Sequence, residues 1–569
     1  MYFAALATDY DGTLAQDGCV DDETLAALHA LRESGRKLIL VTGRELPDLR
    51  RVFSAVDIFD LIVAENGALL FDPKTCEETV LGAEPPKAFI ERLKELGVAP
   101  MSLGRSIVAT WQPHQTAVLE TIRELGLELQ IIFNKDAVMV LPAGVNKATG
   151  LAAALDRLKL SPLNVVAVGD AENDHSFLHA CGCAVAVANA LPMVKEDADL
   201  VMGGARGAGV GELISRLIGN DLADIMDRIA FQRVSLARDL DGTEIGLHPH
   251  SGSILVAGPS GGGKSTFATG VLERLADKRF QFCIIDPEGD YAGLDGAVTV
   301  GDSKSPPRLP EAMGLLWQPA QNVVINLIGV ALADRPRFFA ELIPELSKLR
   351  SQTSRPHWLV IDEAHHLLPP GLGTAAVTLP RELNSSILIT VHPEHIATSA
   401  LESVDTVIAL GGEASGVIRS CCEQLGDPLP ELPEAACEPG EALLWPAGAP
   451  EARRVRMIPP QALRQRHSRK YAEGELEPDK SFYFRGPDGV LNLRAQNLAL
   501  FLQLAEGVDD GTWVHHLRSR DYSHWVRGSL NDNDLADELT AIENDETLDP
   551  RDSRTNVADA IKRRYTAPA

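Results

Sequence analysis

The sequence predicts an α/β protein in which two open, mainly parallel sheets follow one another and a small helical domain comes last. The first observation is a series of short apolar runs, each ending in an acidic or glycine-rich turn, as buried parallel strands do. The second is residues 254–266, ILVAGPSGGGKST, which contain a strand, a glycine-rich turn and the start of a helix. The third is residues 479–569, where helical periodicity dominates.

Length, charge and cysteine usage limit the alternatives. A chain of 569 residues is expected to form about three or four domains. Its 53 lysines and arginines against 80 aspartates and glutamates give a net charge of −27, which disfavours broad binding to nucleic acid or anionic membranes. No apolar run has the length of a membrane span, and the acidic start of the chain is unlike a signal peptide. Eight cysteines without a CxxC pair favour a reducing cytoplasm.

The N-terminal part begins with two predicted strands that end in polar residues. Residues 4–8 form the first strand, and Asp9 and Asp11 follow it on a turn. Two carboxylates at this spacing can converge on a metal ion that prefers oxygen ligands. Residues 37–41 form the second strand, and the hydroxyl of Thr42 after it suits a phosphate group. Both positions lie at the carboxyl ends of strands, where α/β sheets place their ligands.

A helix and a further strand complete this set of motifs. Lys147 lies at the start of a predicted helix over residues 146–158. A strand over residues 164–168 ends just before Asp170 and Asp174, which form a second acidic cluster. Four polar groups in this order, each at the end of an element, are more specific than any one of them alone.

These motifs resemble the haloacid-dehalogenase superfamily of phosphatases, and the resemblance covers residues 1–218. It implies a Rossmann-like core that hydrolyses phosphate monoesters. It also implies that Asp9 is the nucleophile, forming an aspartyl-phosphate, and that Asp11 is the general acid and base. Thr42 and Lys147 would bind the transferred phosphoryl group. The implied Mg²⁺ ligands are Asp9, the Asp11 backbone carbonyl, Asp170 and Asp174.

Residues 82–142 are predicted to form a small α+β insert that precedes Lys147. Its expected elements are helices over residues 85–96 and 114–126 and strands over residues 102–110, 128–133 and 137–141. The position of this insert, and the sequence Glu65-Asn66-Gly67 after a strand over residues 61–64, resemble the capped Cof-type and archaeal phosphoglycolate-phosphatase-like branch. Such a cap implies a small phosphorylated substrate and the exclusion of bulk water.

The glycine-rich stretch in the middle of the chain has the complete P-loop spacing, GxxxxGKS. Glycines allow successive backbone N–H groups to approach phosphate oxygens, and the following helix directs its positive end toward the anion. Lys264 can reach the terminal phosphates, and the hydroxyl of Ser265 can hold Mg²⁺. The predicted ATP-binding residues are Gly258, Pro259, Ser260, Gly261, Gly262, Gly263, Lys264, Ser265 and Thr266.

Further predicted strands near the P-loop end in acidic residues. A hairpin over residues 233–249 precedes the loop, and a strand over residues 280–285 ends in the sequence DPEGDY. A strand over residues 358–361 is followed by Asp362 and Glu363, the Walker B pattern. In this pattern the aspartate holds Mg²⁺ through its water shell, and the glutamate polarises the attacking water.

Residues 233–459 resemble the HerA/FtsK-like ATPases, because GPSGGGKS, IIDPEGDY and LVIDEAHHLLP occur in this order. The resemblance implies a RecA-like domain, ATP hydrolysis and a homo-oligomer, commonly a hexameric ring. Relatives usually have glutamine after a strand that corresponds to residues 386–390, where this chain has Val391-His392, so γ-phosphate sensing and coupling to DNA stay open. Ring ATPases also need an arginine finger from a neighbour. The candidates are Arg350, Arg355, Arg381 and Arg419.

Two linkers are predicted. Residues 219–232 read as a linker helix between the two α/β domains, and residues 460–478 read as a basic linker after the second. The basic run that leads into the second linker contains no acid and is expected to be a solvated segment rather than a phosphate-binding surface. Its members are Arg453, Arg454, Arg456, Arg464, Arg466, Arg469 and Lys470.

The C-terminal domain, residues 479–569, is predicted to be mainly helical and to serve interaction or assembly. A helix is expected over residues 493–506, and the tail from Glu543 onward is expected to be mobile because it is polar. The histidines of this domain have no cysteine or acid at ligand spacing, so we expect them to pack rather than to bind a metal. They are His515, His516 and His524.

Three hypotheses of function are compatible with these motifs. The favoured one is a bifunctional enzyme, a Mg²⁺-dependent phosphatase joined to a HerA-like ATPase. The second is a nucleic-acid end-processing enzyme similar to polynucleotide kinase-phosphatase; Glu363 opposes it, because a kinase must keep water from the γ-phosphate. The third is a nucleotide-switched scaffold whose phosphatase fold only senses a ligand; the complete acidic set opposes it. Free phosphate, a labelled 5′-end or bound nucleotide from labelled ATP would distinguish the three.

The expected partners follow from the favoured hypothesis. They are a small phosphorylated substrate, ATP with Mg²⁺, and further copies of the same chain. Nucleic acid is the less favoured partner because of the net charge, and no membrane partner is expected. Each half carries its own complete set of catalytic motifs, so we expect the two activities to be chemically independent.

Overall fold

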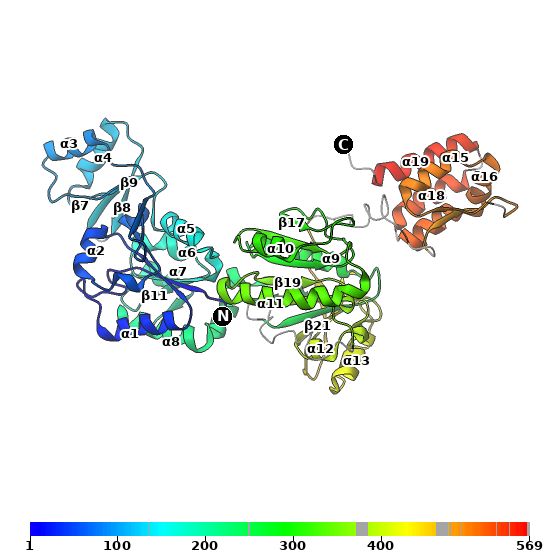
Figure 1. Cartoon of the computed structure of the whole chain (residues 1–569), viewed down its shortest axis with the longest axis horizontal. Coiled ribbons are helices and arrows are strands. Elements are labelled where there is room, and N and C mark those ends of the chain that lie inside the picture. The colour runs from blue at the N-terminus through cyan, green and yellow to red at the C-terminus, as the bar shows by residue number, and fades with distance from the viewer. Residues whose placement is uncertain are drawn as a thin grey trace.

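The structure is a computed structural model that describes residues 1–134, 136–248, 251–370, 385–461, 476, 480–489, 491–530, 532–545 and 547–565. It confirms the predicted α/β class, with two large sheets and a helical C-terminal module (Figure 1). The first sheet has the strand order β12-β11-β10-β1-β2-β3-β4-β5. Its strands are β1 (Ala5–Thr8), β2 (Lys37–Val41), β3 (Leu61–Ala64), β4 (Leu69–Asp72), β5 (Glu77–Val80), β10 (Val165–Gly169), β11 (Cys183–Ala186) and β12 (Leu200–Val201). The strands from β12 to β3 are parallel, and β4 and β5 add an antiparallel hairpin.

Helices connect these strands, and side-chain caps fix where two of them begin. The helices are α1 (Asp22–Glu33), α2 (Leu46–Val52), α5 (Lys147–Leu158), α6 (His175–His179), α7 (Pro192–Asp197) and α8 (Gly207–Asn220). Asp21 caps α1 by accepting the N–H of Thr24 at 2.7 Å. Asn146 caps α5 in a capping box with Thr149, so Lys147 becomes the first residue of that helix.

The insert forms a separate layer made of a four-stranded antiparallel sheet and two helices. Its elements are α3 (Lys87–Glu95), β6 (Ser102–Leu103), β7 (Val108–Trp111), α4 (Gln115–Glu124), β8 (Leu129–Asn134) and β9 (Ala137–Pro142), in the sheet order β6-β7-β9-β8. The single strand predicted over residues 102–110 is therefore wrong. It is a hairpin, because Gly104 donates to the carbonyl of Ile107 at 2.9 Å and Glu65 binds the backbone of the turn.

The predicted linker helix over residues 219–232 is also absent. Helix α8 ends at Asn220, and the next residue, Asp221, has a left-handed φ of 56°. Two short 3₁₀ segments follow, Ala223–Arg228 and Ala230–Gln232. Four apolar side chains between residues 222 and 229 are buried in the core of the N-terminal sheet, so this segment packs onto that domain and is not an exposed linker. The buried residues are Leu222, Ile225, Met226 and Ile229.

The second sheet has eleven strands in the order β14-β13-β23-β22-β21-β15-β20-β19-β16-β18-β17. They are β13 (Val234–Asp239), β14 (Glu244–Leu247), β15 (Ser253–Ala257), β16 (Phe282–Asp286), β17 (Ala297–Val300), β18 (Asn322–Asn326), β19 (Trp358–Ile361), β20 (Ser386–Thr390), β21 (Val404–Leu410), β22 (Glu441–Pro446) and β23 (Arg453–Met457). The helices are α9 (Lys264–Asp277), α10 (Leu309–Leu316), α11 (Arg335–Thr353), α12 (Thr398–Leu401) and α13 (Ala414–Leu425). The strands from β21 to β17 are parallel, with apolar cores on both faces.

The start of the predicted basic run is part of this sheet. Arg453, Arg454 and Arg456 lie on β23. Arg453 pairs with Asp239 at 3.1 Å, and Arg454 pairs with Glu441 at 3.3 Å. Arg453 and Arg454 therefore pair with acids of the same domain. The other members of the run, Arg464, Arg466, Arg469 and Lys470, lie outside the described residues.

A buried polar contact joins the two sheet domains where β10 and β19 begin. Nδ1 of His357 accepts the backbone N–H of Gln281 at 2.8 Å, so the proton of the neutral ring is on Nε2, which donates to Oδ1 of Asn164 at 2.9 Å. Burial lowers the pKa of His357 well below its ordinary value, and the charge of Arg355 adds to this effect. The buried guanidinium of Arg355 donates to the carbonyl of Lys159 at 2.6 Å. The two domains thus meet at the amino ends of β10 and β19, whereas the polar turns follow the carboxyl ends of these strands.

The C-terminal module is a small hairpin covered by helices. Its elements are β24 (Phe482–Phe484), β25 (Leu493–Ala495), α15 (Leu498–Gly507), α16 (Asp510–Ser519), α17 (Asp521–Trp525), a π-helical turn (Val526–Leu530), α18 (Asn533–Asn544) and α19 (Pro550–Tyr565). The helix predicted from residue 493 begins at Leu498, where Asn497 caps it. His516 accepts the backbone N–H of Arg485 at 2.8 Å and contacts Asp521 at 2.7 Å, so this histidine packs within the module.

The prediction of a mobile tail from Glu543 onward is wrong for most of that segment. Residues Pro550–Tyr565 form α19, whose Val557 and Ile561 are buried in the core of the module. The indole N–H of Trp513 donates to Ser553 on the same helix at 2.9 Å. This helix was not predicted from the sequence, because its composition is polar and only one narrow stripe of its surface is apolar.

The described part of the chain contains no helix with the length and apolar character that a bilayer crossing requires. Helix α11 is long enough, but it carries several charged residues and an internal proline, Pro344. All eight cysteines are free thiols. The reducing compartment inferred from their spacing stays a prediction.

Candidate active sites

Three neighbouring strands bring the N-terminal polar residues to one edge of the first sheet. Strand β1 lies between β10 and β2, and Thr8 is in register with both Val168 and Leu40. Asp9 directly follows β1, and Asp170 directly follows β10. Thr42 directly follows β2. All three side chains are buried. The fold therefore gathers residues that lie far apart in the sequence into one pocket of polar groups.

Three carboxylates and one ammonium group form the centre of this pocket. Oxygens of Asp9, Asp170 and Asp174 all lie within 4.8 Å of one another. Nζ of Lys147 lies 2.6 Å from Oδ1 of Asp9 and 2.5 Å from Oδ1 of Asp174. One positive charge thus faces three buried acids. Their oxygens are the ligands that Mg²⁺ prefers, and the uncompensated negative charge makes a divalent cation a good fit.

Electrostatics in the pocket show the same deficit of positive charge. Burial, joined by the charge of Asp174, raises the pKa of Asp9 to about 8, although Lys147 opposes both effects. Burial alone would lower the pKa of Lys147, but Asp174 and Asp9 raise it above its ordinary value. A divalent cation beside Asp9 would favour the carboxylate form that a nucleophile requires.

Backbone geometry fixes the acids in place. Oδ2 of Asp174 accepts the N–H groups of Asp170 at 2.8 Å and Ala171 at 2.9 Å, so the loop after β10 closes around it. Gly12 has a φ of +88°, and a Cβ at this position would lie 2.4 Å from Asp170. Only glycine allows the turn after β1 to pass this close to Asp170.

Asp11 forms an ion pair with Arg44, a residue for which no role was expected from the sequence. Nε of Arg44 lies 2.7 Å from Oδ2 of Asp11, and Nη2 lies 2.7 Å from Oδ1, so the ion pair is bidentate. Nη1 of Arg44 also lies 2.5 Å from Asp48. The bonds to Asp11 raise the pKa of Arg44, so the guanidinium stays charged. The position of Arg44, directly after Thr42-Gly43 at a strand end, was the signal that could have identified it.

Arg44 should therefore act as a positioning residue for proton transfer by Asp11. We expect Arg44→Ala to slow hydrolysis of an alkyl phosphate by about 10- to 100-fold, part of the 10²–10⁴ that a positioned acid supplies. An aryl phosphate with a good leaving group needs less protonation and should lose much less. Arg51→Ala is the matched control, because Arg51 pairs with Asp48 and not with Asp11. Equal losses on both substrates would contradict the positioning role.

The cap is anchored to the core through a buried glutamate. Oε1 and Oε2 of Glu65 accept the backbone N–H groups of Arg105 and Ser106, each at 2.9 Å. The neighbouring Asn66 accepts from Nδ2 of Asn173 at 3.1 Å, on the loop that carries Asp170 and Asp174. The Glu65-Asn66 pair thus links cap, core and site. The predicted motif was correct in position, but its contacts with the cap were not visible in the sequence.

The P-loop is folded around its own lysine. Helix α9 begins at Lys264 after Gly263, whose φ of +95° needs a glycine. Nζ of Lys264 donates to the carbonyls of Gly258 at 2.9 Å and Pro259 at 3.0 Å. Burial lowers the pKa of Lys264, and the charges of Glu363 and Asp362 oppose this effect. The charges of Asp362 and Glu363 thus act on Lys264 across the loop.

Glu363 lies at the end of β19 in a conformation that is unusual for its residue type. Its φ of 42° is left-handed, and such strain is common at functional sites. Nδ1 of His365 lies 3.4 Å from Oε2 of Glu363 and 3.0 Å from Oγ1 of Thr390. Burial lowers the pKa of His365 to about 4, so this ring is neutral near pH 7. His392, at the position where glutamine was expected, packs its ring 5.4 Å from that of His365.

The structure narrows the choice of arginine finger. Arg355 is excluded, since its buried guanidinium is bound within its own chain. Arg350 donates to the carbonyl of Pro356 at 2.9 Å. Arg381 lies outside the described residues. Arg419 is exposed on α13 and remains a candidate.

The first residue of the DPEGDY segment, Asp286, has a structural role. The two oxygens of Asp286 accept the backbone N–H groups of Gly289 at 2.8 Å, Asp290 at 3.1 Å and Tyr291 at 2.8 Å. Burial raises the pKa of Asp286 to about 6, although these bonds favour the charged form. This aspartate fixes the shape of the loop after β16.

These two sites define a class of protein, a capped α/β fold with a buried acidic pocket joined to a P-loop domain. A family model described as haloacid dehalogenase-like hydrolase matches residues 6–108 and 108–214, and one described as helicase HerA, central domain, matches residues 243–381. The chain belongs to the haloacid dehalogenase-like hydrolases in its N-terminal part and carries a HerA-type domain after it. The predicted family resemblances are thereby confirmed.

Curated relatives match the N-terminal part over nearly their whole length. Phosphoglycolate phosphatase from Methanothermobacter thermautotrophicus is 31% identical over 228 residues, which are 38% of this chain and 99% of the relative. Phosphoglycolate phosphatase 2 from Saccharolobus solfataricus is 28% identical over 232 residues, 39% of this chain and 95% of the relative. A solved haloacid dehalogenase-like hydrolase from Bacteroides thetaiotaomicron is 19% identical with a TM-score of 0.34, covering 38% of this chain and 99% of that one.

Proposed function

We propose that the protein is bifunctional: a Mg²⁺-dependent phosphatase for small phosphate monoesters and an ATP-hydrolysing, ring-forming HerA-like ATPase. The observation that carries the phosphatase assignment is the buried group of Asp9, Asp170, Asp174 and Lys147. Its excess of buried negative charge calls for a divalent cation, which together with Lys147 would hold the anionic phosphoryl group. The exposed carboxylate of Asp11 beside this group supplies the proton transfer that hydrolysis requires.

The phosphatase reaction would proceed in two displacements. A carboxylate oxygen of Asp9 attacks phosphorus, the bond to the leaving-group oxygen breaks, and Asp11 donates a proton to that oxygen. Asp11 then takes a proton from water, which attacks phosphorus, releases inorganic phosphate and restores Asp9. Lys147 and Thr42 hold the phosphoryl oxygens. Mg²⁺, held by Asp9, Asp170 and Asp174, supplies the charge neutralisation that makes attack by an anion feasible.

The cap favours a small substrate. It is bound to the core through Glu65, and strand β8 contacts the loop that carries Asp174. Phosphoglycolate, which gives the curated relatives their names, is the first substrate to test. Three apolar cap side chains are buried in one small cluster with Ala68 of the core, which holds the cap close to the core and favours a compact substrate rather than a duplex. They are Ile107, Met139 and Leu141.

In the ATPase half, Lys264 and the P-loop amides would bind the phosphates. Ser265 and Asp362 would hold Mg²⁺, directly and through water. Glu363 would activate the attacking water. Arg419, exposed on the surface, is the candidate finger for a neighbouring copy. Assembly into a homo-oligomer, commonly a hexamer in HerA/FtsK-like ATPases, would complete each site in this way.

We expect the two activities to be independent, and oligonucleotides provide the test. Phosphate release is measured from phosphoglycolate, a nucleoside monophosphate and 3′- or 5′-phosphorylated oligonucleotides, with and without ATP, at low salt. The small esters should react, and ATP should change their rates less than a few-fold, because the domains meet at the strand ends opposite to both sites. A large ATP stimulation confined to oligonucleotides would favour nucleic-acid end processing instead.

A further inference from the structure

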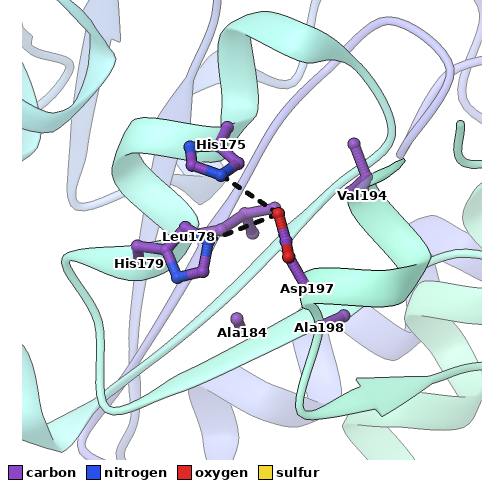
Figure 2. A pocket seen from close by; sticks show the side chains of 7 residues that line it. All are labelled: His175, Leu178, His179, Ala184, Val194, Asp197 and Ala198. Carbon is purple, nitrogen blue, oxygen red and sulfur yellow. Dashed lines mark hydrogen bonds and ion pairs between the residues drawn. The ribbon is translucent and has the colours of Figure 1, made fainter. Parts of the chain in front are cut away.

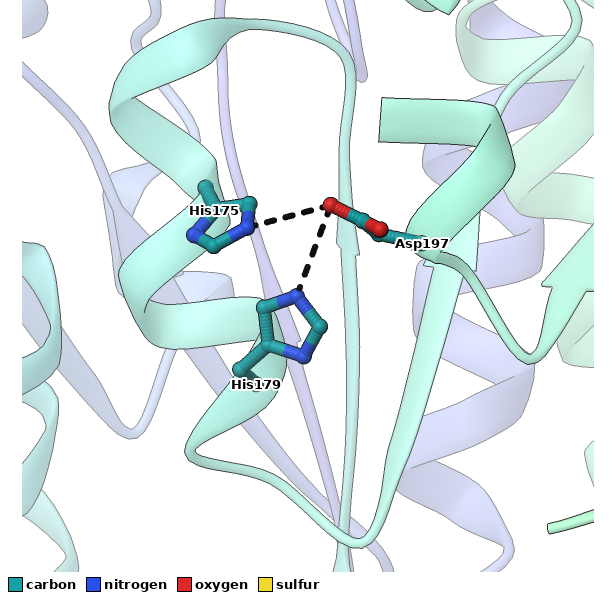
Figure 3. A group of neighbouring side chains, drawn as sticks. All are labelled: His175, His179 and Asp197. Atoms are coloured by element: carbon teal, nitrogen blue, oxygen red, sulfur yellow. Dashed lines mark hydrogen bonds and ion pairs between the residues drawn. The ribbon is translucent and has the colours of Figure 1, made fainter. Parts of the chain in front are cut away.

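A second group of metal-ligating side chains lies on the surface of the phosphatase domain, outside the acidic pocket. His175 and His179 occupy the first and last positions of α6, and Asp197 is the last residue of α7 (Figure 3). Nε2 of His175 lies 3.1 Å from Oδ2 of Asp197, and Nε2 of His179 lies 3.9 Å from the same oxygen. One ligand atom from each residue lies within 4.8 Å of the other two.

This arrangement has the chemistry of a transition-metal site. Histidines four residues apart on a helix face the same side, as in helical zinc motifs. Ligand atoms around a tetrahedral ion at about 2.0–2.1 Å lie roughly 3.3 Å apart, and the observed separations of 3.1 and 3.9 Å bracket that value. Two imidazoles and a carboxylate suit Zn²⁺, Co²⁺ or Ni²⁺, whereas Mg²⁺ prefers oxygen ligands. About half of each side chain is exposed, which leaves a fourth position for water.

The three proposed ligand residues lie on elements that pack against the core of the domain. They surround a small surface depression whose floor is formed by Leu178, Ala184 and Val194 (Figure 2). These three side chains are 2–4% exposed, so they fix α6 and α7 against strand β11. The backbone positions of the three ligands are therefore set by core packing, and only side-chain rotations are needed to close around an ion.

We propose that His175, His179 and Asp197 bind one zinc-class divalent ion that ties α6 to α7. Asp174, which pairs with Lys147, directly precedes α6. Leu191, directly before α7, donates its N–H to the carbonyl of Asp170 at 2.9 Å. The ion would thus clamp together the two segments that adjoin the catalytic acids. Its binding is a property of the folded domain and does not depend on the proposed reaction.

The experiment uses the tag-free full-length protein, stripped with a chelator and kept in excess Mg²⁺ so that the acidic pocket is occupied. Zn²⁺ binding is measured by equilibrium dialysis, and Co²⁺ binding is followed by its visible absorption. His179→Ala and Asp197→Asn should each remove one equivalent of tight binding or weaken it at least about 10- to 100-fold, the loss that even an indirect partner of a ligand causes. Zn²⁺ should raise the melting temperature of the wild type more than that of either variant.

A matched control comes from another exposed group on the ATPase domain. His392, Glu394 and His395 also place ligand atoms within 4.8 Å of one another. His395→Ala should retain the equivalent that His179→Ala loses. All three variants replace exposed side chains, and equal melting temperatures in chelator will show that they fold. Wild-type isotherms for both His179→Ala and Asp197→Asn, or a loss confined to His395→Ala, would overturn the proposal.

Discussion

Replacing Asp9 by asparagine should reduce hydrolysis of phosphoglycolate and of a generic aryl phosphate at least about a thousandfold, as the loss of a nucleophile does in other covalent mechanisms. An amide nitrogen or oxygen cannot form the aspartyl-phosphate. The isosteric side chain keeps the shape of the pocket and its contact with Lys147. Steady-state release of inorganic phosphate measures the effect, and a burst of covalent phosphoprotein should be absent.

The same variant should be at least as stable as the wild type in metal-free buffer. Because the folded-state pKa of Asp9 is raised to about 8 from 3.8, its ionised form opposes folding, and this group's contribution to stability is lost as the pH rises from about 4 to 8. Asparagine removes that charge. Lys264→Ala is the control for the other half and should keep phosphatase turnover within a few-fold of the wild type. Undiminished turnover in Asp9→Asn would refute the nucleophile assignment.

The sequence was most informative where chemistry depends on a local pattern. The P-loop is a single strand–turn–helix unit, so GxxxxGKS specifies both its shape and its ligand. Asp9, Thr42 and Asp170 each directly follow an apolar strand, and neighbouring parallel strands bring such residues together without any further information. The capped phosphatase and the HerA-type domain could be identified from these patterns.

Contacts between distant segments could not be predicted in this way. Two examples are the bidentate ion pair of Arg44 with Asp11 and the hydrogen bonds of Glu65 to the cap backbone. Both depend on side-chain directions that sequence periodicity does not encode. The buried contact between Asn164 and His357 joins residues 193 positions apart. Both are polar residues at strand starts, where a sequence offers no reason to expect burial. Polar α19 was missed because its few apolar residues gain their partners only from the rest of the module.

Glu363→Gln should bind ATP but hydrolyse it at least about 100-fold more slowly, since removal of a group that prepares the attacking water raises the barrier by several kcal/mol. The P-loop, Ser265 and Asp362 are unchanged, so nucleotide and Mg²⁺ should stay bound. Retention of labelled ATP after gel filtration and release of labelled phosphate measure binding and hydrolysis separately. Lys264→Ala should instead lose much of the binding, because no other side chain replaces its charge at the terminal phosphates.

Glu394→Gln is the matched control for this experiment. Glu394 is a partly exposed carboxylate near the same strand ends and contacts His392 at 2.8 Å, but it does not follow the Walker B strand. It should therefore keep hydrolysis near the wild-type rate. Glu363 is distinguished by its strained backbone, by its contact with neutral His365 and by its charge, which acts to raise the pKa of Lys264. Hydrolysis at the wild-type rate in Glu363→Gln, with loss in Glu394→Gln, would move the water-activating role to the segment around His392.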